Sequence, residues 1–169
     1  MLSNVVTDLT ASKTVYRPDI DGMRALAVLG VVIYHAGIPG LTGGFTGVDV
    51  FFVISGFLIT GSLLDELQSS GNVSISSFYA RRARRILPAL ILVIFSTMVA
   101  GAFLLYTVDD QVLLFESAVS AGLFVANEYF RHYSGGYFDG PAEWIPLLHL
   151  WSLSVEEQFY LIWPVLLVS

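Results

Sequence analysis

Two ionisable side chains lie inside apolar runs of this sequence. His35 lies near the end of run 24–38, and Asp49 lies near the start of run 45–64. An ionisable group within a hydrocarbon layer is costly unless it is paired or hydrated, so each is a candidate functional residue. The Gly- and Pro-rich segment between the runs predicts antiparallel neighbouring helices. With the turn centred on Thr42, both side chains lie at similar depth. We expect Asp49 to accept a hydrogen bond from one His35 nitrogen and to leave the other as a base.

A simpler interpretation of the same two residues stays open. His35 can be a histidine at a helix end that bonds a backbone carbonyl. Asp49 can be a carboxylate near a helix N-terminus, where the helix dipole favours negative charge. The spacing alone does not separate a catalytic pair from these two ordinary roles.

A second polar group opens the last apolar run. On a helix His149, Ser152 and Glu156 form one stripe, while Glu157 points away from it. The pattern predicts that Glu156 lies in the outer half of this span and faces the other helices. The alternative is an amphipathic, interfacial helix start that Trp151 anchors.

Four arginines stand close together in the stretch FYARRARRILP, residues 78–88. Arg82 and Arg85, three residues apart, share a helix face, and guanidinium groups bind phosphate in a bidentate manner. A nucleotide or a coenzyme A would fit them, and so would anionic lipid headgroups. The same cluster can also be nothing more than a topology signal next to a membrane span.

The composition predicts an all-α, polytopic membrane helix bundle. Hydrophobic residues make up 55% and charged residues 13%, with a mean hydropathy of +0.72. There is no cysteine, which excludes a thiol nucleophile and a cysteine-based metal site, and no metal site is expected. Nucleic-acid binding is not expected, because the one basic cluster adjoins a membrane span. The expected spans are about four in number, at residues 22–38, 45–64, 86–106 and 147–168.

Residues 112–126 form a shorter apolar run that contains Glu116. A re-entrant or interfacial helix is favoured here over a fifth span. Every lysine and arginine except Arg131 falls on one side of such a bundle, which predicts a cytoplasmic segment 1–20 and a mostly external segment 107–146. We expect residues 21–169 to be the N-terminal part of a longer membrane domain.

Four blocks of the sequence, in order, resemble the acyltransferase-3 family of integral membrane acyltransferases. The blocks are YRPDIDGMRALAVLGVVIYH at 16–35, GGFTGVDVFFVISGFLIT at 43–60, FYARRARRILP at 78–88 and LLHLWSLSVEEQFYLIWP at 147–164. Met23 stands where the family usually has Leu. The family includes O-acetylases of lipopolysaccharide, peptidoglycan and other glycans outside the cytoplasm.

The resemblance implies a catalytic role for His35, importance for Glu156 and a place for Arg82 and Arg85 near cytoplasmic acyl-CoA. On this interpretation no cofactor is bound, and acyl-CoA, expected to be acetyl-CoA, is the donor substrate. The acceptor would be a hydroxyl of a glycan, and the location would be a bacterial inner membrane with lipid and later helices as partners. We expect Asp49 to orient His35. The residues expected to contact substrate are Arg24, His149, Ser152 and Gln158.

Two other functions stay open at this point. His35, Asp49 and Glu156 could form a proton or ion path in a transporter or channel subunit. The bundle could also be purely structural. The arginine cluster favours the enzyme, because an acyl-CoA enzyme needs an anion-binding group and a transporter does not. Direct transfer and an acyl-histidine relay are not separated by the sequence.

Overall fold

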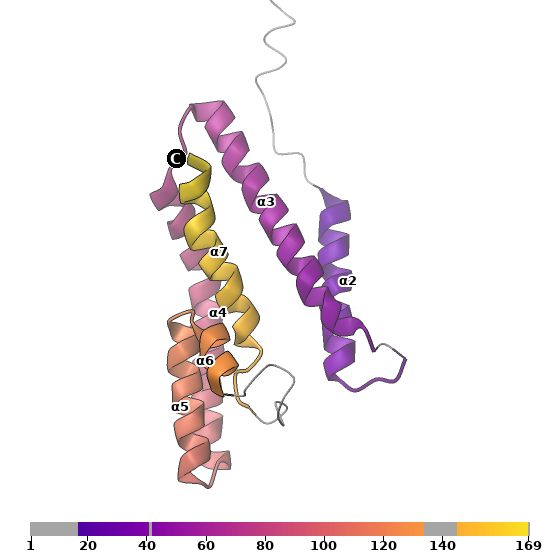
Figure 1. Ribbon diagram of the computed structural model, residues 1–169, viewed down its shortest axis with the longest axis vertical. Helices are drawn as coiled ribbons and strands as arrows, with labels where there is room; N and C mark the ends of the chain where they lie inside the picture. Colours follow the sequence, from indigo (N-terminus) through magenta and orange to yellow (C-terminus); the bar gives the residue numbers. More distant parts are fainter. Residues whose placement is uncertain (1–16, 41, 134–144, 169) are drawn as a thin grey trace, which may run out of the picture. The chain divides into compact units, whose positions relative to one another are not determined.

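The computed structural model describes residues 17–40, 42–133 and 145–168, and all regular elements in these ranges are helical. This confirms the expected all-helical class; most of the predicted segment 1–20 lies outside the described residues. The elements, shown in Figure 1, are α2 (Pro18–His35), the 3-10 helix η2 (Gly44–Thr46), α3 (Gly47–Ser70), α4 (Ile75–Leu104), α5 (Val108–Gly122), α6 (Ala126–Tyr133) and α7 (Leu150–Val168).

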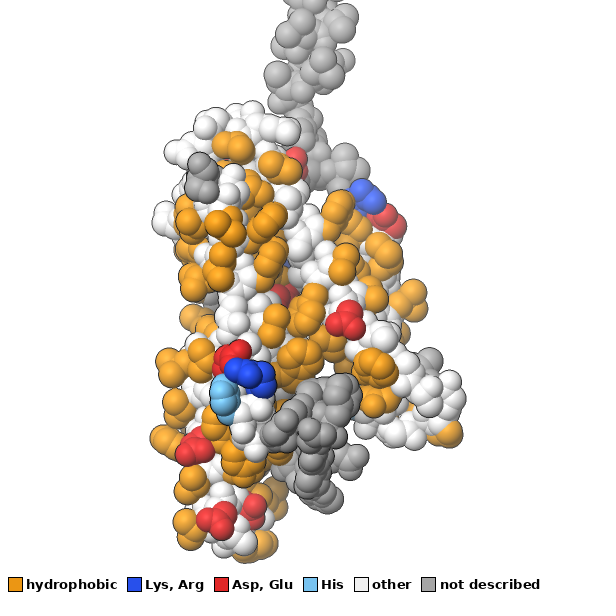
Figure 2. Space-filling view, in the orientation of Figure 1, with side chains coloured by type: hydrophobic (Ala, Val, Ile, Leu, Met, Phe, Trp, Pro, Cys, Tyr) orange, Lys and Arg blue, Asp and Glu red, His pale blue; other side chains and the backbone are white. Residues whose placement is uncertain are grey.

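Two of the helical stretches described here are long and apolar enough to cross a membrane. They are Gly44–Ser70 and Ile75–Leu104. Their large apolar side chains are widely exposed, for example Val53 at 73% and Phe103 at 77%. Figure 2 shows hydrophobic side chains spread over the visible face, with few charged ones among them. A core helix of a soluble protein buries such side chains, so this exposure favours a lipid environment.

The chain divides into two compact units, one ending at Val73 and the other starting at Ser74. In the first unit α2 and α3 form a tight antiparallel hairpin. A Cβ atom on Gly44 would lie 2.3 Å from the carbonyl oxygen of Gly30, and one on Gly47 would lie 2.3 Å from that of Ala27. The two backbones can approach so closely because these positions carry no side chain.

The second unit is built around α4, with α5 and α7 beside different halves of it (Figure 1). At the C-terminal half, a Cβ atom on Gly101 would lie 2.1 Å from a methyl carbon of Leu114 in α5. At the N-terminal half, the Tyr79 hydroxyl donates a 2.7 Å hydrogen bond to the carbonyl of Leu161 in α7. The buried core between these helices contains Leu90, Leu114, Ala118, Ala121, Ala126, Phe130, Leu147 and Leu150.

The segment expected at 112–126 is α5, and it lies four residues earlier in the chain. It begins early because Thr107 caps it: the Thr107 hydroxyl oxygen accepts a 3.1 Å hydrogen bond from the Asp110 amide. The chain then turns at Phe124, whose φ is +56°, and enters α6, a helix that the sequence analysis did not predict. At 15 residues α5 is about 22 Å long, less than the roughly 30 Å of a hydrocarbon layer.

The close contact at Gly47 predicts a specific loss of stability in the variant Gly47→Ala. The added methyl group meets the Ala27 carbonyl, and overpacking of this kind costs about 1–3 kcal/mol. Gly61→Ala, on the same helix, is the matched control, because nothing lies within 4 Å of its added Cβ. Thermal unfolding of the detergent-solubilised full-length protein should show a lower midpoint for Gly47→Ala alone. Equal midpoints for the two variants would contradict the close packing of this hairpin.

Candidate functional site

His35 is the last residue of α2 and its side chain is exposed. Its Nδ1 lies 2.8 Å from the backbone carbonyl oxygen of Val31. A carbonyl oxygen can only accept, so Nδ1 carries the hydrogen and donates it. In the neutral ring Nε2 then keeps its lone pair and is free to act as a base. The Val31 carbonyl therefore fixes the orientation of the ring.

The predicted match in depth between His35 and Asp49 is wrong. The hairpin places Gly47 against Ala27, which puts Asp49 level with the middle of α2, roughly three helical turns before His35. The contacts of Gly44 with Gly30 and of Gly47 with Ala27 centre the hairpin near Gly37, so it is not symmetric about Thr42. The partner of His35 Nδ1 is the Val31 carbonyl and not the Asp49 carboxylate, as the simpler interpretation of the histidine expects.

Asp49 lines a groove of about 520 Å³ between α2 and α3 instead. Arg17 lies at the same groove, whose other lining side chains are apolar. The groove brings a carboxylate and a guanidinium to one apolar surface, away from the end of α2 that carries His35.

His132 shows how common the geometry of His35 is. It also lies in the last turn of its helix, α6, and its Nδ1 is 2.8 Å from the carbonyl oxygen of Glu128. The contact is therefore an ordinary one for a histidine in a final helical turn, and it does not by itself mark a catalytic residue. His132 offers a matched control for experiments on His35.

Arg24, expected to contact substrate, is partly buried and engaged within the hairpin. Its guanidinium carbon lies 5.3 Å from the ring centroid of Phe51 in α3, and one nitrogen lies 3.9 Å from the Asp21 carboxylate. The cation–π contact ties α2 to α3. A substrate contact of Arg24 stays a prediction.

Arg82 lies in a compact polar cluster between α4 and α7. The Arg82 side chain is 18% exposed, and its Nη2 lies 3.7 Å from Oε1 of Glu157, which is 17% exposed. Its guanidinium carbon is 3.5 Å from the ring centroid of Tyr160. Tyr160 is buried, and its hydroxyl donates a hydrogen bond to the Glu156 carboxylate. The cluster thus joins a predicted donor-binding arginine to the predicted catalytic glutamate.

Two atoms of this cluster are buried without a hydrogen bond. Arg82 Nε and Glu157 Oε1 find no hydrogen-bond partner among the described residues. The charges of the two groups compensate each other across 3.7 Å, but the distance is too long for a hydrogen bond. The attraction is therefore mainly electrostatic, strengthened by the partial exclusion of water.

The expected positions of the arginines and Glu156 need correction. The sequence pattern predicts Arg82 at the cytoplasmic boundary and Glu156 in the outer half of its span. The structure places both around Tyr160, so they lie level with each other. The Arg82 side chain packs into the contact between α4 and α7, whereas the Arg85 side chain is exposed. The two arginines therefore lie in different environments. Long side chains such as that of Arg82 contact residues of a neighbouring helix, and the residue spacing within one helix does not predict these contacts.

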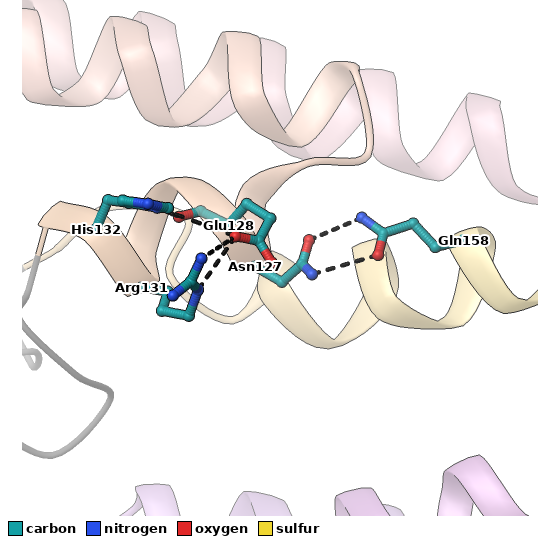
Figure 3. Close-up of polar contacts among 5 residues, drawn as sticks. All are labelled: Asn127, Glu128, Arg131, His132 and Gln158. Atoms are coloured by element: carbon teal, nitrogen blue, oxygen red, sulfur yellow. Dashed lines mark hydrogen bonds and ion pairs between the residues drawn. The ribbon is translucent and has the colours of Figure 1, made fainter.

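Gln158, expected to contact substrate, connects α7 to the end of α5 and to α6. Its amide nitrogen donates to the Phe124 carbonyl at 2.8 Å and to the Asn127 side-chain oxygen at 2.9 Å. Its oxygen accepts from the Asn127 amide nitrogen at 3.3 Å, as Figure 3 shows. Ser154 adds a bond nearby, since its hydroxyl oxygen accepts from the Ala126 amide at 3.2 Å. These bonds hold the turn with positive φ at Phe124.

His149 and Ser152 stay at the entry to α7. His149 is exposed and lies in the turn before Leu150, where the helix begins, so it is not the helical residue that the stripe assumed. The Ser152 hydroxyl donates to the His149 carbonyl at 3.1 Å. A substrate contact of either side chain stays a prediction.

On α6, Arg131 donates to Glu128, with a contact of 2.7 Å (Figure 3). This hydrogen bond, together with the attraction between the charges, lowers the pKa of Glu128. Tyr129 donates to Glu116 of α5 at 2.8 Å. Burial, reinforced by that hydrogen bond, raises the pKa of Tyr129 well above its usual range.

Sequence reasoning missed Glu157 and Tyr160 as partners of Arg82. The sequence carried a signal only for the contact of Tyr160 with Glu156, because residues four apart on a helix lie side by side. The contact to α4 had no sequence signal. In the described ranges no group of three or more His, Cys, Asp or Glu side chains could hold a metal ion.

Residues 17–168 match the family model described as "Acyltransferase domain". The chain is 45% identical over 91% of its length to a "Putative O-acetyltransferase" of Staphylococcus aureus strain MSSA476, of which it covers 25%. It is 45% identical over 90% of its length to the "Putative peptidoglycan O-acetyltransferase YrhL" of Bacillus subtilis, covering 24%. It is 41% identical over 90% to the "Peptidoglycan O-acetyltransferase OatA" of Listeria monocytogenes, also covering 24%. The chain thus spans about a quarter of the length of these relatives. No solved structure matches it significantly.

The bonds of Gln158 predict that Gln158→Ala destabilises the second unit. The change leaves the partly buried Asn127 side chain and the Phe124 carbonyl without their partner, at a cost of about 1–3 kcal/mol. Gln68→Ala is the matched control, because Gln68 is exposed on α3. Thermal unfolding of the full-length protein should show a lower midpoint for Gln158→Ala only. An unchanged midpoint would mean that Gln158 is not a structural anchor and would favour the substrate contact.

Proposed function

Because this chain belongs to the acyltransferase domain family, we propose that it is the N-terminal part of a membrane-bound O-acyltransferase. The whole protein would move an acyl group, most simply acetyl, from cytoplasmic acyl-CoA to a hydroxyl of a glycan outside the cytoplasm. The observation that carries the proposal is the match of residues 17–168 to that family. The orientation of His35 is compatible with it, because Nδ1 donates to the Val31 carbonyl and Nε2 is left as a base in an exposed ring.

His35 acts in this proposal as the general base. Nε2 takes the proton of the acceptor hydroxyl while its oxygen forms a bond to the thioester carbonyl carbon. The bond from that carbon to sulfur then breaks, and the imidazolium returns the proton to the departing thiolate. A positioned base of this kind contributes about 10²–10⁴-fold in rate. The alternative, in which the acyl group rests briefly on Nε2, uses the same nitrogen.

The donor would bind through arginine side chains on α4. Arg85 is exposed, so its guanidinium is available for the phosphates of coenzyme A. The Glu156 carboxylate, held by Tyr160 level with Arg82, would tune the site on the donor side. Asp49 lies too far along the hairpin to orient His35 and would serve substrate binding at its own groove.

The names of the relatives favour peptidoglycan as the acceptor. Two of the proteins to which this chain is similar are named for peptidoglycan O-acetylation, and none of those compared above is named for lipopolysaccharide. We therefore propose a peptidoglycan hydroxyl as acceptor, in place of the broader set of glycans expected from the sequence.

The proposed setting is the cytoplasmic membrane of a bacterium. There α2, α3, α4 and α7 would be spans, α5 would be re-entrant, and the N-terminal segment would be cytoplasmic. The exposed apolar side chains on α3 and α4 fit this environment. The rest of the domain would complete the cavity.

His35→Ala should abolish acetyl transfer by the full-length protein, with a loss of about 10²–10⁴-fold in kcat. The control is His132→Ala, which removes a histidine with the same carbonyl contact outside the proposed centre. The rate of acetyl transfer from radiolabelled acetyl-CoA to peptidoglycan fragments measures the effect. Size-exclusion chromatography should show that both variants are folded. Comparable rates for the two variants would remove His35 from the mechanism.

A further inference from the structure

The Arg82 guanidinium already has its main partners within this chain. One face lies against the Tyr160 ring at 3.5 Å, and one edge lies 3.7 Å from the Glu157 carboxylate. The three side chains come from α4 and α7, and all are largely withdrawn from water. An arginine that binds coenzyme A phosphates instead needs an edge that is open to water, whereas the Arg82 side chain is only 18% exposed.

Capture of a phosphate by Arg82 would also disturb Glu157. The incoming anion would take the guanidinium away from the carboxylate, which would be left partly buried without its compensating charge. Breaking a buried ion pair in this way is strongly unfavourable. Arg85 carries no such penalty, because it is exposed three residues further along α4.

We propose that Arg82 and Glu157 are positioning residues, which hold α7 on α4 and fix Tyr160 so that its hydroxyl orients the Glu156 carboxylate. The ring face under the guanidinium sets the direction of the Tyr160 hydroxyl, and that hydroxyl donates to Glu156 one turn earlier on α7. A second tie, from the Tyr79 hydroxyl to the Leu161 carbonyl, fixes the same register between the helices. Contact with the donor phosphates then falls to Arg85.

The test compares Glu157→Gln with Arg85→Gln in the full-length protein. Both substitutions remove one charge, and Glu157→Gln keeps the side-chain volume. With acetyl-CoA and peptidoglycan fragments, we expect Glu157→Gln to lower kcat about tenfold or more and to leave the KM for acetyl-CoA within about twofold. We expect the reverse for Arg85→Gln, with the KM for acetyl-CoA raised about tenfold and kcat nearly unchanged.

Two further variants separate positioning from a general loss of structure. Tyr160→Phe keeps the ring under Arg82 but removes the hydroxyl, so kcat should fall while the unfolding midpoint changes little. The charge exchange Arg82→Glu with Glu157→Arg should recover activity that each single reversal loses. These effects on kcat are not expected from a residue that only stabilises the fold.

The opposite result has a clear signature. If Arg82 binds the donor phosphates, Glu157→Gln removes a competing carboxylate, and the KM for acetyl-CoA falls while kcat is unchanged. That outcome, or an unaltered kcat in Tyr160→Phe, would overturn the positioning role.

The measurement of activity rests on the proposed function. A separate measurement distinguishes failure of the proposed function from failure of the positioning role. If the wild-type protein transfers no acetyl group, the proposed function fails. A double-mutant cycle of Arg82→Gln and Glu157→Gln, followed by thermal unfolding, then still tests the ion pair. Additive effects on the free energy of unfolding would overturn the pair, and coupled effects would support it.

Discussion

A guanidinium removed from water needs a negative charge and a polarisable surface nearby, and Arg82 imposes that requirement on α4 and α7. Glu157 supplies the charge and Tyr160 supplies the aromatic face. Because both come from α7, that helix has to lie beside the arginine-bearing half of α4. The register between the helices, and with it the surroundings of Glu156, depends on this compensation together with the hydrogen bond from Tyr79 to Leu161.

Neutral hydrogen bonds from the same stretch of α7 fix it to a different neighbour. Gln158 and Ser154 bind backbone groups at Phe124 and Ala126, where the chain leaves α5 and enters α6. The same helix therefore meets α4 through charge and α6 through amide and hydroxyl groups. Glu156 lies within the same two turns as both sets of contacts, so its carboxylate is carried by a stretch of helix that is held on two faces.

Much of the helical fold could be predicted from the sequence, because apolar runs of the right length indicate where spanning helices form. The polar partners were harder to predict. The predicted pairing of His35 with Asp49 failed because the hairpin is centred near Gly37 and not on Thr42. The register of a hairpin depends on where glycines let the two backbones approach, which residue counting does not predict. The Arg82 cluster was missed because Arg and Tyr side chains reach a neighbouring helix that sequence spacing does not locate. The blocks that mark the family were recognisable in the sequence, and the family model matches the same part of the chain.

The length of α4 has a consequence for the lipid around it. Its 30 residues extend for about 45 Å, roughly half as much again as a hydrocarbon layer is thick. When the apolar C-terminal half of α4 lies in lipid, the N-terminal turns that carry the arginines either project beyond the hydrocarbon layer or thin the bilayer locally. Leu161, which is exposed, is level with these turns through its bond to Tyr79. At this depth the arginines favour water whereas the exposed leucine favours an apolar environment, so a local distortion of the bilayer or further protein around α7 is needed to satisfy both.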